Sequence, residues 1–190
     1  RYGLNVADVQ AVVSGAIALA YGTYVQSNGT ATQVNNWSGG AVTASGGTLT
    51  GAGSASVTLT SSGDVNLTGA TVTADKLNLV MTGAGKTLTT TATLFGLKAS
   101  AAPVNVAASC GITAGAGSHL TVDAGAFLNI ANTKTLTLPM YADGATLVPN
   151  GIIGGAGTLA ITMSDGDRST RLGTILCPLT IASINTAADH

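Results

Sequence analysis

A ladder of apolar residues at one fixed interval constrains the fold of this chain more than any other feature. The ladder recurs every sixteen positions, at Val72, Leu88, Val104, Leu120, Leu136 and Ile152. Corners of small residues recur at the same interval, at 83–85, 99–101, 115–117 and 131–133. A fixed period this short indicates one structural unit stacked on copies of itself.

Within each interval, apolar residues alternate with Thr, Ser or Asn, as in Thr71-Val72-Thr73 and Thr87-Leu88-Thr89. This is the period-two pattern of a strand with one buried face. Two short strands and two corners account for the sixteen residues, and they predict an all-β solenoid in which each repeat is one coil. The alternative is an antiparallel sandwich or jelly roll with donor-strand exchange, in which each repeat is a hairpin. The solenoid is favoured because one column stays apolar over successive repeats.

The composition points away from nucleic acid and membranes. Only 8% of the 190 residues are charged, Glu is absent, and the net charge is −1. A chain with so little charge has no basic face for nucleic acid or for anionic lipid. No stretch has the length of uninterrupted apolar sequence expected of a membrane-spanning helix. Weak self-repulsion suits a protein that associates with copies of itself.

Residues 5–25 alternate over a longer stretch than an ordinary strand covers. We expect one long strand there, or alternatively a helix that caps the open end of the solenoid. A hairpin turn is expected at Asn28-Gly29. The assembly residues predicted in this segment are Val9, Val13, Gly15, Ile17, Leu19 and Tyr21. The predicted organisation is an N-terminal assembly segment at 1–40, a β-repeat domain at 41–184 and a frayed tail at 185–190.

A single strand of this length would reach about 55 Å at about 3.3 Å per residue, which exceeds a compact domain of this size. We therefore expect part of residues 5–25 to contact another subunit. An apolar strand added to a neighbour's sheet edge resembles donor-strand exchange in pili, with the small Gly15 passing a constriction.

Two cysteines, Cys110 and Cys177, form a candidate disulfide, within a chain or between subunits, if the protein is extracellular. Neither belongs to a C-x-x-C pair, and neither His119 nor His190 has ligand-like spacing to them, so no zinc site is expected. Glycosylation sequons begin at Asn28, Asn36 and Asn66. The sequence begins at Arg1 without Met, which is expected if an export signal has been removed or if the translation start lies elsewhere.

The one charged cluster contains Asp165, Asp167, Arg168 and Arg171. It is a weak candidate for calcium binding or for a polysaccharide-lyase site, because calcium takes six or more oxygen ligands and only two carboxylates are close in sequence. A solvated loop or an ion-pair patch between subunits is the favoured interpretation. Residues 83–87 (GAGKT) superficially resemble the end of a phosphate loop but lack its upstream glycine. We expect no catalytic residues, cofactor or metal, and no enzyme activity.

The composition and the ladder, over residues 41–184, resemble those of extracellular β-rich fibre proteins: haemagglutinin- or adhesin-like solenoids and surface-filament subunits. This resemblance implies a structural subunit of a self-assembling extracellular or cell-surface filament, sheath or fibre, viral fibres included, whose partners are copies of itself. One alternative is a carbohydrate-binding adhesin or a polysaccharide-lyase-like β-helix with glycan partners. Another is an ice-binding protein, because the Thr-x-Thr rows at 71–73, 87–89 and 135–137 resemble those of ice-binding solenoids.

Overall fold

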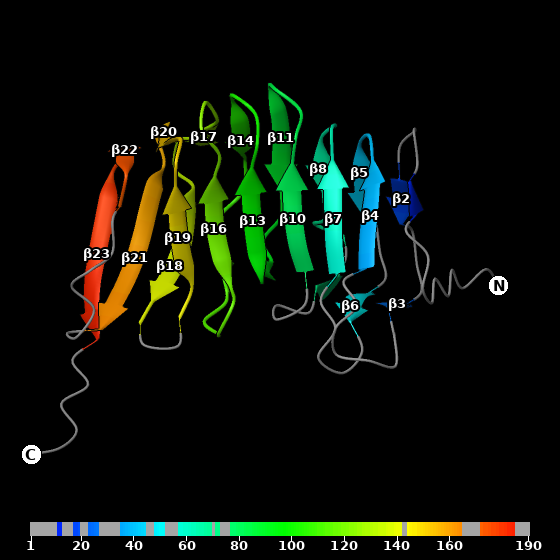
Figure 1. Ribbon diagram of the computed structural model, residues 1–190, viewed down its shortest axis with the longest axis horizontal. Coiled ribbons are helices and arrows are strands. Elements are labelled where there is room, and N and C mark those ends of the chain that lie inside the picture. Colours follow the sequence, from blue (N-terminus) through cyan, green and yellow to red (C-terminus); the bar gives the residue numbers. More distant parts are fainter. Residues whose placement is uncertain are drawn as a thin grey trace, which may run out of the picture.

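The protein is a β-solenoid, and the predicted fold class is confirmed (Figure 1). The computed structural model describes residues 11–12, 17–19, 23–26, 35–44, 48–51, 57–69, 71–72, 77–141, 144–164 and 172–184. Strands and loops make up this part of the chain, and no described residue is helical. The strands pair in parallel, and the stack runs in sequence order along the long axis.

Three sides build the solenoid. The first side is the sheet of β1 (Ala11–Val12), β4 (Asn35–Gly39), β7 (Val57–Ser61), β10 (Leu77–Met81), β13 (Gly96–Ala99), β16 (His119–Val122) and β19 (Thr146–Pro149). The second side is the sheet of β2 (Ile17–Leu19), β5 (Val42–Ala44), β8 (Val65–Asn66), β11 (Lys86–Thr89), β14 (Val104–Val106), β17 (Phe127–Ile130), β20 (Ile152–Gly155) and β22 (Thr174–Leu176).

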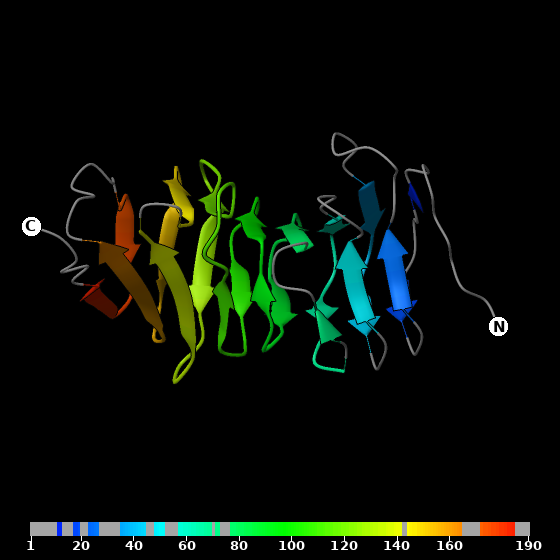
Figure 2. The same cartoon turned by 90° about the horizontal axis from the view of Figure 1, so that it is seen from below.

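The third side is divided between two sheets. One contains β3 (Thr23–Gln26), β6 (Thr48–Gly51) and β9 (Thr71–Val72). The other contains β12 (Thr93–Leu94), β15 (Cys110–Ile112), β18 (Thr135–Met140), β21 (Thr158–Ser164) and β23 (Leu179–Ile184). No described pairing joins β9 to β12. The chain visits the three sides in turn and returns to the first side one strand further along. The turned view shows the strands stacked along the long axis (Figure 2).

The predicted repeat of sixteen residues is wrong. Asn78 pairs with Gly96, 18 residues further on, whereas His119 pairs with Thr146, 27 residues further on. A coil therefore holds three strands and varies in length. One strand with its corner takes about eight residues, so sixteen residues cover two sides of a three-sided coil. The sequence pattern thus reported the strand-and-corner unit but not the number of sides.

The ladder residues consequently do not stack on one another. Leu88 lies in the second sheet, Leu120 in the first and Leu136 on the third side, and all three are buried. Ile152, the last ladder position, points out of the second sheet and is exposed.

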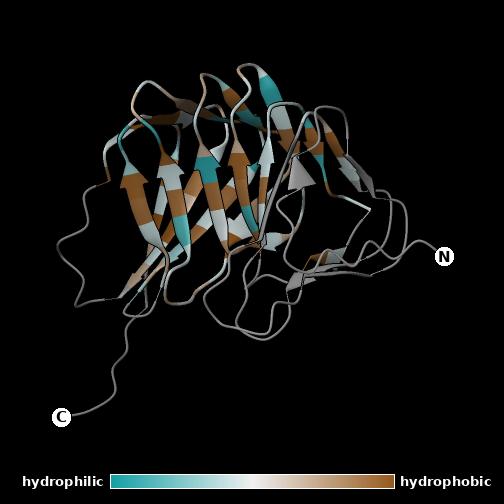
Figure 3. Ribbon diagram, turned by 45° about the vertical axis from the view of Figure 1, so that its right-hand side comes forward, coloured by the Kyte–Doolittle hydropathy of each residue, from teal (hydrophilic) through white to brown (hydrophobic). Residues whose placement is uncertain are grey.

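A different column of leucines forms the true stack. The leucines of the first sheet are in register from strand to strand, at Leu59, Leu79, Leu97, Leu120 and Leu147. The first four are fully buried, and Leu147 is nearly so. Parallel in-register pairing places each of these side chains directly on its equivalent in the neighbouring coil, which builds one continuous core. Apolar and polar residues alternate along these strands (Figure 3).

The corners let neighbouring coils approach closely. Between β7 and β8, the Ser61 hydroxyl donates a hydrogen bond to the carbonyl oxygen of Gly40 at 2.6 Å, and Val42 N–H donates to the carbonyl oxygen of Asp64 at 2.8 Å. Ser61 is fully buried, so this contact satisfies a polar group that has no access to water. Gly63 lies between these two contacts, against the backbone of the preceding coil.

The N-terminal segment differs from the expected single long strand. Its described residues form β1, β2 and β3, which pair in parallel with β4, β5 and β6 on three different sides. The prediction of one continuous strand is therefore wrong for this part of the chain, because its described strands belong to three different sheets. The turn expected at Asn28-Gly29 lies outside the described residues. The domain boundaries at residues 40 and 184 stay predictions.

Candidate assembly and binding surfaces

The C-terminal end of the solenoid exposes core positions. In β23, Leu179 is paired with Leu159 and Ile181 with Ile161. Leu159 and Ile161 are buried, whereas Leu179 is 40% exposed and Ile181 is 53% exposed. The four residues occupy equivalent inward positions, so the difference arises because no further described strand pairs with β23. We call β22 and β23, with Leu179 and Ile181, the open end.

The N-terminal coil presents the opposite edge. Ile17 of β2 is in register with Val42, and Leu19 with Ala44. Val42, the register partner of Ile17, is fully buried. Among the described strands, β2 has β5 as its one partner. Two of the predicted assembly residues, Ile17 and Leu19, thus stand at an edge strand; the other four, Val9, Val13, Gly15 and Tyr21, lie outside the described residues.

The second sheet carries an apolar patch on its outer face, near the open end. Phe127 is paired with Ile152, and Gly154 with Leu176. A Cβ added at Gly154 would lie 2.6 Å from Cε2 of Phe127 and 3.5 Å from Cβ of Leu176, so the Phe127 ring occupies the space over this glycine. Ile152 is 37% exposed and Leu176 66% exposed. We call Phe127, Ile152 and Leu176 the outer patch.

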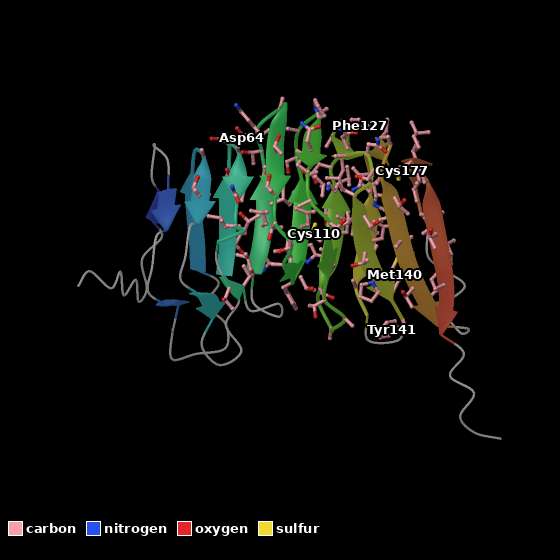
Figure 4. All side chains as sticks on the ribbon, turned by 180° about the vertical axis from the view of Figure 1, so that it is seen from behind. Asp64, Cys110, Phe127, Met140, Tyr141 and Cys177 are labelled. Carbon is pink, nitrogen blue, oxygen red and sulfur yellow. The ribbon has the colours of Figure 1, made fainter. Side chains whose placement is uncertain are left out.

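The predicted disulfide does not form within the chain. Cys110 and Cys177 are both free thiols. Cys110 lies in β15, and β18 and β21 separate it from β23, which begins just after Cys177. Strands about 4.8 Å apart place the two cysteines well beyond the 4.4–6.8 Å Cα separation that a disulfide requires. Figure 4 shows them apart along the axis. Burial raises the pKa of the Cys110 thiol to about 12.

A polar cluster lies on the outer face of the first sheet, where Asn78, Gly96 and His119 are consecutive register partners. His119 Nδ1 lies 3.1 Å from the carbonyl oxygen of Gly117. The buried Oδ1 of Asn78 has no hydrogen-bond partner. A Cβ at Gly96 would lie only 2.6 Å from Nε2 of His119 and still closer to Asn78, so the two side chains already close over the glycine and leave no room for a ligand.

The described carboxylates do not form a metal site. Asp123 accepts a hydrogen bond from the Ser100 hydroxyl at 2.7 Å, and it forms an ion pair with Lys98 at 3.0 Å. These contacts lower the pKa of the Asp123 carboxyl, with the Ser100 hydrogen bond as the larger cause. No described group of three His, Cys, Asp or Glu residues is placed to hold a metal ion. The weak calcium candidates Asp165 and Asp167 lie outside the described residues.

Of the predicted glycosylation positions, Asn66 is the one whose side chain is described. It is exposed, and its Oδ1 accepts hydrogen bonds from the hydroxyl of Thr68 at 2.7 Å and from Thr68 N–H at 3.1 Å. The backbone of Asn36 lies in β4, and Asn28 is outside the described residues. Modification of any of these positions stays a prediction.

The Thr-x-Thr rows do not share a column. Thr71 is in β9, Thr87 in β11 and Thr135 in β18, so the three rows lie on three different sheets. The ice-binding alternative was based on an expected flat array of threonines, and this expectation is therefore wrong. The sequence pattern suggested it because the rows recur at the sixteen-residue interval, which moves from side to side of the coil.

Sequence reasoning missed both the open end and the outer patch. Leu179 and Ile181 stand on either side of Thr180 as Leu159 and Ile161 stand on either side of Ala160, and nothing in the local sequence distinguishes the exposed pair from the buried pair. The outer patch joins residues of three coils. Ile152 and Gly154 are close in sequence, but the strand register is needed to show that their partners are Phe127 and Leu176.

No protein-family model, no curated protein and no solved structure matches the chain. A proposal for its function is therefore based on the fold and its surfaces. Within the described residues, no helix is long and apolar enough to cross a membrane.

Proposed function

We propose that this protein is a non-enzymatic structural subunit that assembles end to end into an extracellular or cell-surface filament, sheath or fibre. The observation that carries the proposal is the open end, where β22 and β23 each lack a partner on one side among the described strands. Unpaired parallel strands with apolar inward side chains are a template for another chain. The proposed occupant is the N-terminal coil of a second copy.

The N-terminal coil suits this role because it belongs to the same stack. Each internal coil already meets its neighbours through parallel strands in register, so one end of the molecule has the same geometry as the surface that it would join. β2 carries Ile17 and Leu19 at an edge of the second sheet, and β22 ends the same sheet at the other end. A head-to-tail contact of two different surfaces generates an open filament rather than a closed dimer.

The exposed side chains at the open end give the contact a magnitude. Fully burying a Leu or Ile side chain contributes about 1.5–3 kcal/mol. Given the exposed fractions of Leu179 and Ile181, stacking gains roughly 2 kcal/mol from these two residues. This corresponds to about 30-fold in the association constant. Strand pairing of β22 and β23 adds hydrogen bonds to this term.

The proposed location outside the cell rests on composition, because low charge and abundant small residues suit a surface fibre. The two free cysteines add no support to it.

Electron microscopy and sedimentation of the purified full chain test the assembly. We expect filaments above a critical concentration, and Ile181→Lys should raise that concentration by 30-fold or more because it places a charge in the junction. Thr180→Lys is the matched control: Thr180 is the preceding residue of β23, it points outward and it is exposed. It should polymerise as the wild type does. A wild-type protein that stays monomeric at every concentration, or an Ile181→Lys variant that polymerises normally, would refute the proposal.

A further inference from the structure

One corner near the C-terminal end of the solenoid carries an asparagine followed by a glycine. Asn-Gly occurs twice in the sequence, at 28–29 and at 150–151, and the structure describes the second pair. This pair joins β19 to β20, and Asn150 is exposed. An asparagine side chain can react with the backbone nitrogen of the next residue, and a glycine there has no side chain that hinders the approach. The corner therefore holds a chemically reactive pair in contact with solvent.

The packing of the coils requires the glycine at position 151. A Cβ there would lie 2.8 Å from Cγ1 of Val122, and it would be closer still to the carbonyl oxygens of Asp123 and Ala126. Val122 and Ala126 are buried in the preceding coil, so a larger residue cannot replace Gly151 unless the corner moves. The reactive pair thus follows from the fold, because no side chain can be placed at position 151 to shield Asn150.

The folded corner holds the reacting nitrogen in a hydrogen bond. Gly151 N–H donates to the carbonyl oxygen of Val122 at 2.9 Å, and Ile152 N–H donates to the carbonyl oxygen of Ala126 at 3.0 Å. The reaction needs the deprotonated nitrogen of Gly151 to reach Cγ of Asn150, so the first of these hydrogen bonds must break. Segments near the end of a fold open locally more readily than its centre. Reaction at Asn150 therefore depends on how often this corner opens.

We propose that Asn150 is a site of spontaneous deamidation, which the folded corner holds closed and which loosens the C-terminal coils once it has reacted. The Gly151 nitrogen forms a bond to Cγ of Asn150, and the side-chain amide group leaves as ammonia with the proton that the Gly151 nitrogen gives up. Water then opens the resulting five-membered succinimide at either carbonyl and gives aspartate or isoaspartate. The two steps exchange ammonia for water and need no oxidant or reductant. The inference does not depend on assembly into filaments.

Either product disturbs the corner. Asn150 is the first residue after β19 as Asp123 is the first residue after β16, and the residues that precede them are register partners, so the two positions are equivalent and one coil apart. Asp123 is charged at neutral pH, because the Ser100 hydrogen bond and Lys98 lower the pKa of its carboxyl. Aspartate at position 150 would add a like charge one strand spacing, about 4.8 Å, further along the stack. Isoaspartate would add one carbon to the main chain, which displaces Gly151 from its hydrogen bond.

Peptide mass spectrometry of the full chain tests the reaction at this one site. Trypsin releases residues 135–168, in which Asn150 is the sole asparagine, so the mass of this peptide reports its deamidation. The protein is incubated at mildly alkaline pH with and without urea. We expect the reaction to be at least about tenfold slower in the folded protein, because it requires local opening of the corner. Asn150→Gln is the matched control: it keeps the amide, but its cyclisation would need a six-membered ring, so its peptide should not change in mass.

The melting temperature after reaction in urea and refolding tests the loosening. We expect the reacted wild type to melt lower by about 2 °C or more than Asn150→Gln that has been treated in the same way. No reaction of Asn150 in urea would overturn the site, and equal rates with and without urea would overturn the closed corner. A reacted protein that melts together with the control would overturn the loosening of the C-terminal coils.

Discussion

Substitution of Gly63 by Ala tests how closely the coils are packed at their corners. A Cβ at this position would lie 2.6 Å from Cα of Ala41 and 2.7 Å from the carbonyl carbon of Gly40, and it would be nearer still to Ala41 N. All three atoms are backbone of the preceding coil, so no side chain can rotate away. Carbon atoms in contact are about 3.5–4.0 Å apart, so the corner must move by roughly 1 Å.

This movement acts on two hydrogen bonds that join the coils. They run from the Ser61 hydroxyl to the carbonyl oxygen of Gly40, and from Val42 N–H to the carbonyl oxygen of Asp64. Each contributes about 1 kcal/mol net, and a buried polar group left without a partner costs about 1–3 kcal/mol. Since the Ser61 side chain is fully buried, we expect Gly63→Ala to lower the free energy of unfolding by about 2–4 kcal/mol.

Urea denaturation followed by far-ultraviolet circular dichroism measures this change. The matched control is Gly115→Ala, another corner glycine, where an added Cβ would meet nothing within 4 Å. The control should be neutral or stabilising by up to about 1 kcal/mol, because alanine restricts the unfolded chain. If Gly63→Ala unfolds within about 0.5 kcal/mol of the wild type, the corners are not packed against the preceding coil as described.

Three further substitutions address the core and its titrating groups. Leu97→Ala, in the middle of the leucine column, should lower the free energy of unfolding by about 2–5 kcal/mol. The control Thr121→Ala, on the outer face, should change it by less than about 0.5 kcal/mol. Equal effects of the two substitutions in urea denaturation would contradict the burial of the leucine column. The lowered pKa of Asp123 stabilises the folded state above the ordinary carboxyl pKa of 3.8, and this contribution is lost as the pH falls through the lower folded value. In a plot of melting temperature against pH, Asp123→Asn should therefore reduce the fall of the melting temperature at acidic pH. An unchanged fall would count against the Ser100 and Lys98 contacts. The pKa of Cys110, raised from 9.0 to about 12, favours the neutral thiol in the fold, so stability falls as the pH rises from 9 to 12; Cys110→Val should remove part of this alkaline slope, and an identical slope would show that the thiol is not buried.

The sequence pattern predicted strands well, but it predicted the length of each coil poorly. The alternation around Val72 and Leu88 predicted strands, and these residues lie in β9 and β11. The coil length was mistaken because inward positions on all three sides are apolar, so many intervals match the pattern. Residues 5–25 were mistaken for one strand for the same reason, since the alternation does not show that Ala11–Val12, Ile17–Leu19 and Thr23–Gln26 belong to three different sheets.

The surfaces proposed for assembly depend on information that local sequence does not hold. Ile161 and Ile181 have the same strand context, yet one is buried and the other half-exposed, because burial depends on whether another coil follows. A disulfide within the chain is absent because pairing of Cys110 and Cys177 depends on how many strands separate them, and a link between subunits stays a prediction. Ile17 and Leu19 were singled out as apolar members of a terminal segment; the register adds that they stand at an edge. The role of this segment in assembly stays a prediction.

The division of the third side has a mechanical consequence. Along most of the described stack, three walls of hydrogen bonds tie each coil to the next, and the stack resists bending in every direction. At the junction between β9 and β12, the first and second sheets continue but no described pairing crosses the third side. A beam braced on two of its three faces is most compliant toward and away from the unbraced face. Flexure of this molecule should therefore concentrate near residues 72–93 and have one preferred plane. In a fibre of such subunits, thermal bending would then take place mainly in that plane at every subunit.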